Sequence, residues 1–144
     1  GTSIDFTGIP AGVKRVTVMF NGVSTSGTSN IIVQVGSGSV TASGYAGYVC
    51  RFGASSNAYL TYSTGFLIQE TTAATYTTIG SLVITNISSN TWVGSGNATN
   101  SAAVNGTNVT AGSIALSGAI DRVRITTVNG TDTFDAGSVN VFWE

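Results

Sequence analysis

Ionisable side chains are scarce in this chain of 144 residues. It has no histidine, five Lys and Arg residues and six Asp and Glu residues, so only 8% of its residues are charged, against about 25% in ordinary proteins. The lack of histidine removes the usual general base and the commonest metal ligand, and with them the histidine-dependent catalytic triads. Five cations are too few for a basic patch that binds nucleic acid. The composition therefore argues against most enzymes and against a nucleic-acid partner.

Two further absences narrow the class of protein. Cys50 is the only cysteine, so an internal disulfide is impossible, and with no histidine to activate its thiol we expect a small buried apolar residue. Although the mean hydropathy is +0.30, no run approaches the ~20 apolar residues that cross a bilayer. We therefore expect no membrane insertion. No targeting segment is visible, and we expect the chain to be a fragment of a longer protein.

The residues that are present favour strands. About forty Ser and Thr residues supply most of the polarity, and Val, Ile and aromatic residues are common, whereas strong helix formers are few. Apolar and polar residues alternate in several short segments, as at Val16, Val18 and Phe20. This pattern predicts an all-β fold, an antiparallel β-sandwich or jelly-roll-like domain over residues 1–144. Strands are expected near 13–22, 30–36, 47–53, 58–62, 66–70, 75–87, 91–95, 109–117, 121–129 and 137–143.

Two of these segments resemble each other. Gly12–Val18 reads GVKRVTV, Ala119–Ile125 reads AIDRVRI, and each is followed by Asn-Gly. We interpret them as two similar strands that could be neighbours in a sheet, and not as a duplicated domain. Arg15, Arg122 and Arg124 lie on the polar faces of these strands, where cross-strand ion pairing is the expected role.

Acidic residues follow the second of these segments. Asn129-Gly130 is a strong signal for a β-hairpin, and Asp132 and Asp135 continue the turn chemistry. A calcium loop needs more acidic ligands than this segment has, and glycoside hydrolysis needs two carboxylates across a pocket. We therefore expect Asp132 and Asp135 to form a turn, in preference to a weak cation site or a catalytic site. No metal or other cofactor is expected.

The two ends of the chain resemble a known family. Ile4–Ser39 (IDFTGIPAGVKRVTVMFNGVSTSGTSNIIVQVGSGS) and Leu116–Glu144 (LSGAIDRVRITTVNGTDTFDAGSVNVFWE) are similar to the C-terminal domains of bacteriophage tail fibre proteins. The resemblance implies a homotrimeric β-structured fibre tip, located on the virion and outside the host cell, that recognises a host cell-surface glycan or another outer-membrane component. Lipopolysaccharide and capsule are the implied receptors. No catalytic motif of the family is carried over, so the chain is not expected to be an enzyme.

Two other functions compete with receptor binding. A polysaccharide depolymerase would need two acids facing one groove, and the six acidic residues fall mostly at expected strand ends or turns. A bacterial adhesin or pilin-like module is also rich in Thr and Asn, and such modules are often closed by a Lys–Asn isopeptide bond, which only Lys14 could form here. Receptor binding is favoured over both.

Host specificity is predicted in Ser43–Thr64, with Tyr45, Arg51 and Tyr59 as the contact residues. Aromatic rings stack on sugar faces, and the arginine fork binds a carboxylate or phosphate. The assignment depends on strand parity, which takes residues 48, 50 and 52 as inward-facing and so turns 45, 49 and 51 outward. Leu60, Tyr62 and Trp143 are expected in the core, with Tyr59 facing out.

Overall fold

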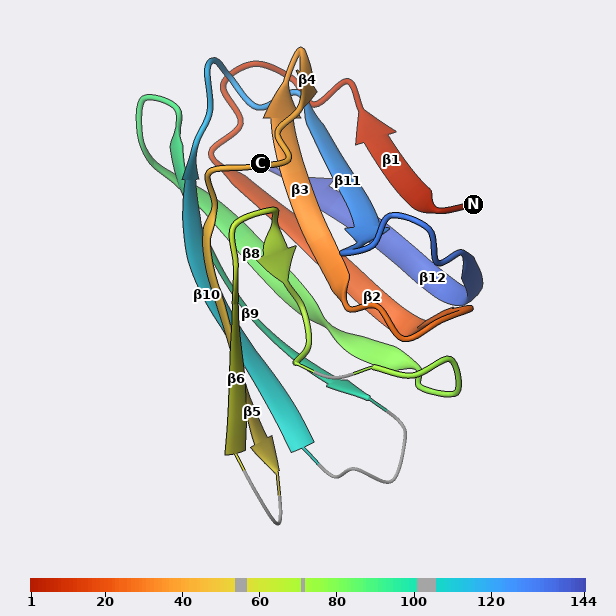
Figure 1. Cartoon of the computed structure of the whole chain (residues 1–144). Helices are drawn as coiled ribbons and strands as arrows, with labels where there is room; N and C mark the ends of the chain where they lie inside the picture. The colour runs from red at the N-terminus through yellow and green to blue at the C-terminus, as the bar shows by residue number, and fades with distance from the viewer. Residues whose placement is uncertain (54–56, 71, 101–105) are drawn as a thin grey trace.

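The computed structural model describes residues 1–53, 57–70, 72–100 and 106–144, and these residues form twelve strands and no helix. The strands belong to two antiparallel sheets that face each other as a β-sandwich (Figure 1). The prediction of an all-β antiparallel sandwich is confirmed. The strands are β1 (Ser3–Thr7), β2 (Arg15–Thr25), β3 (Ile31–Ser37), β4 (Ser39–Val40), β5 (Ala46–Gly53), β6 (Asn57–Tyr62), β7 (Phe66–Leu67), β8 (Thr78–Ser88), β9 (Thr91–Asn100), β10 (Gly106–Ala115), β11 (Arg122–Thr127) and β12 (Phe134–Trp143).

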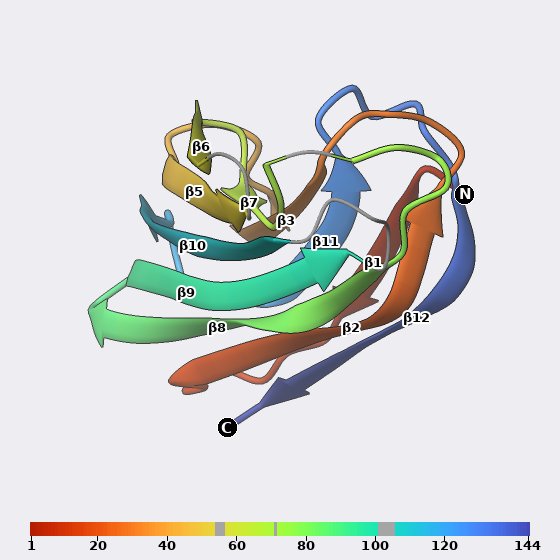
Figure 2. The ribbon, with the colours of Figure 1, turned by 90° about the horizontal axis from the view of Figure 1, so that it is seen from below.

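The two sheets differ in size. The large sheet has seven strands in the order β12-β2-β8-β9-β10-β5-β6, and the small sheet has the order β1-β11-β3-β4, with β7 also paired to β3. Figure 2 shows the large sheet curving, so that β5 and β6 lie beside β7 at the edge of the small sheet. Strands β5 and β6, called here the β5–β6 pair, are therefore the end of the large sheet that wraps around the sandwich.

Most expected strands are present with shifted ends. The expected strand 91–95 is β9, which continues to Asn100, and the expected strand 66–70 is reduced to the two residues of β7. Strands β1 and β4 are additions that the alternation does not predict. Strand β1 forms because it pairs with β11, with Asp5 opposite Arg124 in the register.

The main core lies between the sheets. Alternate residues of β2 and β11 are buried, and Val16, Val18, Val123 and Ile125 belong to one cluster that draws on both sheets. The alternation read from the sequence therefore identifies the inward faces of β2 and β11 correctly. Trp143 is partly buried and packs against this cluster, in line with its predicted place at the core.

The two similar segments are not neighbours. Strand β2 belongs to the large sheet and β11 to the small one, so they contribute to the same core from opposite layers. The idea that they pair within one sheet is wrong. Similar alternation arises because each strand has one buried and one exposed face.

Neither Asn-Gly pair forms a hairpin. Asn21-Gly22 lies inside β2, where Gly22 has φ +66 and the register with β8 shifts between Phe20 and Val23, so the pair marks a β-bulge. Asn129-Gly130 does form a turn, because the Gly130 N–H donates to the Thr127 carbonyl at 3.0 Å. This turn connects β11 to β12, which lie in different sheets. The turn prediction is confirmed, and the hairpin prediction is wrong.

Candidate functional site

Tyr45 is a core residue, although the sequence predicted that it faces outward. Its side chain is 4% exposed, and its ring meets Phe66 edge-on with centroids 5.2 Å apart. The hydroxyl oxygen accepts from the Val35 N–H at 2.8 Å and lies 3.0 Å from the Thr41 carbonyl oxygen. Burial raises the pKa of Tyr45 to about 12. The prediction failed because it followed the parity assumed for β5, whereas residues 45, 47 and 49 are the buried ones.

Arg51 is held by an acidic partner and is not available to a receptor. Its Nε lies 2.7 Å from Oε2 of Glu70, and the two side chains are only 14% and 16% exposed. The backbone of Glu70 is fixed in turn, since its N–H donates to Oδ1 of buried Asn108 at 2.8 Å. Asn30 donates to the Glu70 carbonyl at 3.1 Å. Arg51 therefore attaches β5 to the segment after β7, and its predicted role as an outward contact is wrong.

The predicted parity of β5 is inverted. Val49 is buried, while Tyr48 and Phe52 are 58% and 53% exposed, and Cys50 is half-buried. Gly47 explains the inversion, because a Cβ on it would lie 2.9 Å from the carbonyl oxygens of Tyr62 and Gly65. The face of β5 that carries residues 47 and 49 is thus pressed against neighbouring chain. Both the inward orientation of residues 48, 50 and 52 and the burial of Cys50 were predicted wrongly.

The orientation of Tyr59 is confirmed. It is 76% exposed and lies opposite Cys50 in the β5–β6 register, while Tyr48 lies opposite Thr61. Because side chains alternate along strands, Tyr48, Phe52 and Tyr59 share one face of the β5–β6 pair. This face, called here the aromatic face, has no charged side chain among the described residues, since Arg51 is on the opposite one.

The opposite face of the β5–β6 pair attaches it to the sandwich. A small cluster of Ile32, Val49 and Leu67 joins β3, β5 and β7, and Leu60 and Tyr62 pack against it. The predicted inward orientation of Leu60 and Tyr62 is confirmed in this sense, although both are only partly buried. Figure 1 shows the β5–β6 pair extending beyond the small sheet, so the aromatic face is carried on a projecting part of the molecule. Residues 54–56 of the predicted Ser43–Thr64 segment lie outside the described residues.

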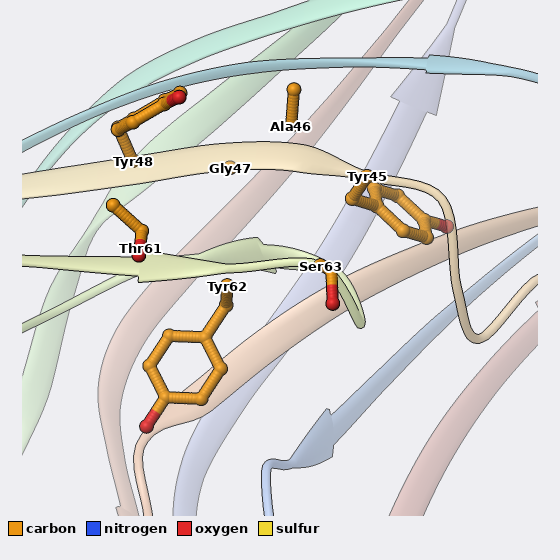
Figure 3. A pocket seen from close by; sticks show the side chains of 7 residues that line it. All are labelled: Tyr45, Ala46, Gly47, Tyr48, Thr61, Tyr62 and Ser63. Carbon is orange, nitrogen blue, oxygen red and sulfur yellow. The ribbon is translucent and has the colours of Figure 1, made fainter.

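A groove of about 240 Å³ runs along this pair and is lined by residues 45–48 and 61–63. Figure 3 shows Tyr48 and Thr61 on one side of the two strands and Tyr62 on the other. The groove therefore continues from the aromatic face around the edge strand β6. Tyrosine rings and Thr and Ser hydroxyls are the groups it offers to a ligand.

A larger concavity of about 350 Å³ lies on the outer face of the small sheet. Its long polar side chains are already occupied, because Gln34 donates to the Thr64 carbonyl at 2.8 Å and Arg124 forms two hydrogen bonds to Asp5, although the Thr64 hydroxyl has no partner. The residues that line it include no aromatic ring. The aromatic face is the stronger candidate for ligand binding.

The acidic loop is structural. Asp132 accepts hydrogen bonds from Asn129 Nδ2 at 2.7 Å and from the Ser29 N–H at 2.9 Å, and these bonds lower its pKa. Asp135 accepts a hydrogen bond from the Ser24 hydroxyl. The predicted turn role is confirmed for Asp132 but is wrong for Asp135, which lies within β12 and bonds across to β2. Within residues 1–53, 57–70, 72–100 and 106–144, no three His, Cys, Asp or Glu side chains gather as a metal site would require.

Four of the five cations form ion pairs. Arg15 pairs with Glu144 and Arg124 with Asp5, each across neighbouring strands as predicted. Arg122 pairs instead with Asp121, its neighbour in sequence. Lys14 has no carboxylate partner among the described residues, and its Nζ donates to Oδ1 of Asn86 at 3.3 Å. The lysine that an isopeptide bond would require thus does lie beside an asparagine.

The part of the chain that the structure describes contains no helix long and apolar enough to span a membrane. Searches with this chain against protein-family models, curated proteins and solved structures found no significant match. The functional argument therefore depends on the site itself.

Proposed function

We propose that this chain is the C-terminal receptor-binding tip of a bacteriophage tail fibre, which adsorbs to a polysaccharide on the host cell surface. The observation that carries the proposal is the aromatic face, with Tyr48, Phe52 and Tyr59 each more than half exposed on one uncharged surface. The sequence resemblance of both chain ends to tail fibre tips supports the biological setting. In this proposal the chain is one domain of a longer fibre, located on the virion and assembled as a homotrimer.

Aromatic side chains suit sugar recognition for physical reasons. A ring offers a rigid apolar surface to the C–H face of a sugar, and a tyrosine hydroxyl adds a hydrogen bond at its edge. Little charge has to be desolvated when such a surface is covered. Each contact is weak, so useful adsorption comes from several copies of the site acting together. Three tips in one trimer supply this multivalency.

The contact residues are revised accordingly. Tyr59 is kept, while Tyr48 and Phe52 replace Tyr45 and Arg51, because the latter pair is buried or ion-paired. Nothing in the local sequence separates the two faces of β5, since both contain apolar residues. The one local feature that could have indicated the inward face is Gly47, because a glycine within a strand often marks a place where another backbone approaches closely.

Single substitutions test this assignment. We expect Tyr48→Ala, Phe52→Ala and Tyr59→Ala to reduce adsorption of the purified fragment to host cells, with a melting temperature close to that of the parent. Phe142→Ala is the matched control, because Phe142 is also 53% exposed but lies on β12 at the far edge of the same sheet. Normal adsorption by all three variants, or equal loss with Phe142→Ala, overturns the assignment.

The assembly and the lack of catalysis have separate tests. Because few residues are charged, much of the surface of one domain is uncharged, and association into a closed symmetric oligomer would cover it. Light scattering is therefore expected to give the mass of a trimer. A monomer at micromolar concentration rules this out. Release of oligosaccharides from purified capsule by the fragment alone would show that it is a depolymerase.

An adhesin-like module is the second candidate, and the Lys14–Asn86 contact is the observation in its favour. In that case the Lys14 amine attacks Cγ of Asn86 and ammonia leaves as the amide bond forms. The contact is exposed, and none of the described carboxylates pairs with Lys14 to assist proton transfer. Intact mass spectrometry decides the point, since a mass lower by one ammonia favours the adhesin and an unchanged mass favours the fibre tip.

A further inference from the structure

A third pocket lies at the end of the sandwich that carries the β8–β9 turn. It has a volume of about 190 Å³ and is lined by residues from the segment before β2, the β8–β9 turn with the strand ends beside it, and the segment before β11, among them Lys14, Asn86, Ser89 and Trp92. Figure 1 shows the β8–β9 turn at the top of the view and the β5–β6 pair at the bottom. The Asn86 N–H donates to the Lys14 carbonyl at 2.8 Å, which holds two walls of the pocket together.

This pocket carries an unbalanced positive charge. All the charged side chains of the chain fall in its described part, and each of the four arginines has a carboxylate partner, which leaves Lys14 alone. The two acids left over, Asp132 and Asp135, bond to Ser29 and Ser24 near the opposite end of β2. No acidic side chain therefore neutralises Lys14 from within the pocket wall.

Trp92 adds a hydrogen-bond donor without a partner. Its side chain is 2% exposed, and its indole Nε1 has no hydrogen-bond partner in the described structure. Buried N–H groups are nearly always paired, because an unpaired one forfeits its hydration. The Asn86 amide is already used, since its Nδ2 donates to the carbonyls of Ser89 at 2.9 Å and Thr91 at 3.2 Å, and its Oδ1 accepts from Lys14. Besides Lys14 and the indole N–H, the lining offers the Ser89 hydroxyl and the Asn90 amide, each of which can donate a hydrogen bond.

We infer that this pocket binds an oxyanion, the carboxylate or phosphate of a ligand no larger than one sugar unit. Lys14 supplies the charge and the Trp92 indole N–H supplies a hydrogen bond. A volume of about 190 Å³ lies below the ~300 Å³ at which pockets for larger organic ligands begin. Nε1 is closed off from solvent, so a ligand reaches it only if the pocket lining shifts locally. The inference does not depend on the proposed function, because the pocket is remote from the aromatic face.

The two tryptophans make the test direct. In a ¹⁵N-labelled sample, the indole signals of Trp92 and Trp143 are followed while glucuronate, glucose 6-phosphate or glucose is added to the full chain. We expect saturable movement of the Trp92 signal with an anionic sugar, little movement of the Trp143 signal, and no effect of neutral glucose. A response to glucuronate alone assigns a carboxylate ligand, and a response to glucose 6-phosphate alone assigns a phosphate.

Variants separate this site from its alternatives. Lys14→Met is expected to weaken binding at least tenfold, Lys14→Arg to retain most of it, and Tyr59→Ala to leave it unchanged while adsorption falls. An absent or non-saturable Trp92 response, an equal response to glucose, or unaltered binding by Lys14→Met overturns the inference and leaves a pocket that holds water only. Failure of adsorption without failure of anion binding, or the reverse, tells the two proposals apart.

Discussion

The β5–β6 pair differs in construction from the rest of the sandwich, which is called here the body and comprises all the described strands other than β5 and β6. In the body, one cluster of buried apolar residues joins both sheets, and strands such as β2 contribute every second side chain to it. The β5–β6 pair rests on a cluster in which Val49 is its only fully buried apolar residue, with the Arg51–Glu70 ion pair beside it. Stability is therefore concentrated in the body, and the aromatic face of the pair is free to change.

This difference explains why the β5–β6 pair can carry large exposed apolar residues. Tyr48, Phe52 and Tyr59 contribute little to the core, so their replacement has a small effect on folding. Side chains of the body that look equally apolar cannot be changed in this way. The receptor-binding role proposed for the aromatic face needs this separation between exposed residues and core.

The largest expected effect comes from the body. Phe66 is fully buried, and its ring packs so closely that a Cβ on Gly94 would lie 2.8 Å from it. We expect Phe66→Ala to lower the free energy of unfolding by about 3–5 kcal/mol, because it leaves a cavity in the core. Urea unfolding measures this, with Tyr59→Ala as the control. A similar loss in both variants would remove the distinction between body and pair.

The next effect concerns the attachment of the pair. Arg51→Met leaves Glu70 as an uncompensated, mostly buried charge, and we expect a loss of about 2–4 kcal/mol. Amide hydrogen exchange should become faster in β5 and β6 than in β2. The double variant Arg51→Met/Glu70→Leu should recover part of the loss, because no charge is then left unpaired. Uniformly faster exchange along the chain would mean that the ion pair stabilises the whole sandwich.

A smaller gain is expected at the β8–β9 turn, which belongs to the body. Ser89 has φ +41 and is the only described residue other than glycine with a positive φ. Ser89→Gly should raise the free energy of unfolding by about 1 kcal/mol, since glycine adopts this conformation without strain. Gly130→Ala is the matched control of opposite sign, because Gly130 has φ +68 and open space around its Cβ position. Thermal unfolding of both variants checks the prediction, and a loss with Ser89→Gly contradicts it.

The smallest effect is a pH dependence confined to acid conditions. The pKa of Asp5 is lowered from 3.8, first by its hydrogen bond with Arg124, and that of Asp121 by its hydrogen bond with Arg122. A carboxyl with a lowered folded-state pKa contributes stability above its unfolded pKa and loses it as the pH falls through the folded value. We therefore expect stability to decline below about pH 4, and Asp5→Asn to reduce that slope.

The same acid titration compares the two regions. Residues 46–62 contain no Asp or Glu, so acid should loosen the small sheet of the body before it changes the β5–β6 pair itself. Hydrogen exchange at pH 3 and pH 6 measures this order. Earlier opening of β5 and β6 would contradict this order.

Composition and alternation alone were enough for the fold class and for part of the core. Scarce helix formers and frequent β-branched residues exclude a helical fold, and the alternation at Val16, Val18 and Phe20 marks the buried face of β2 without any knowledge of its partners. The orientation of Tyr59 follows in the same way from Leu60. These features are local, because side-chain alternation is a property of a single strand.

Tertiary structure decided the rest of the candidate site. Apolar residues occupy both faces of β5, so its orientation depends on contacts with chain that is distant in sequence, such as Gly65 against Gly47. The partner of Arg51 is likewise Glu70, beyond two further strands. Asn129-Gly130 specifies a turn but not which sheet the next strand joins, since a turn sets local direction and strand pairing is settled by the burial of whole faces. Local sequence determined the elements, and non-local packing determined which side chains face the solvent.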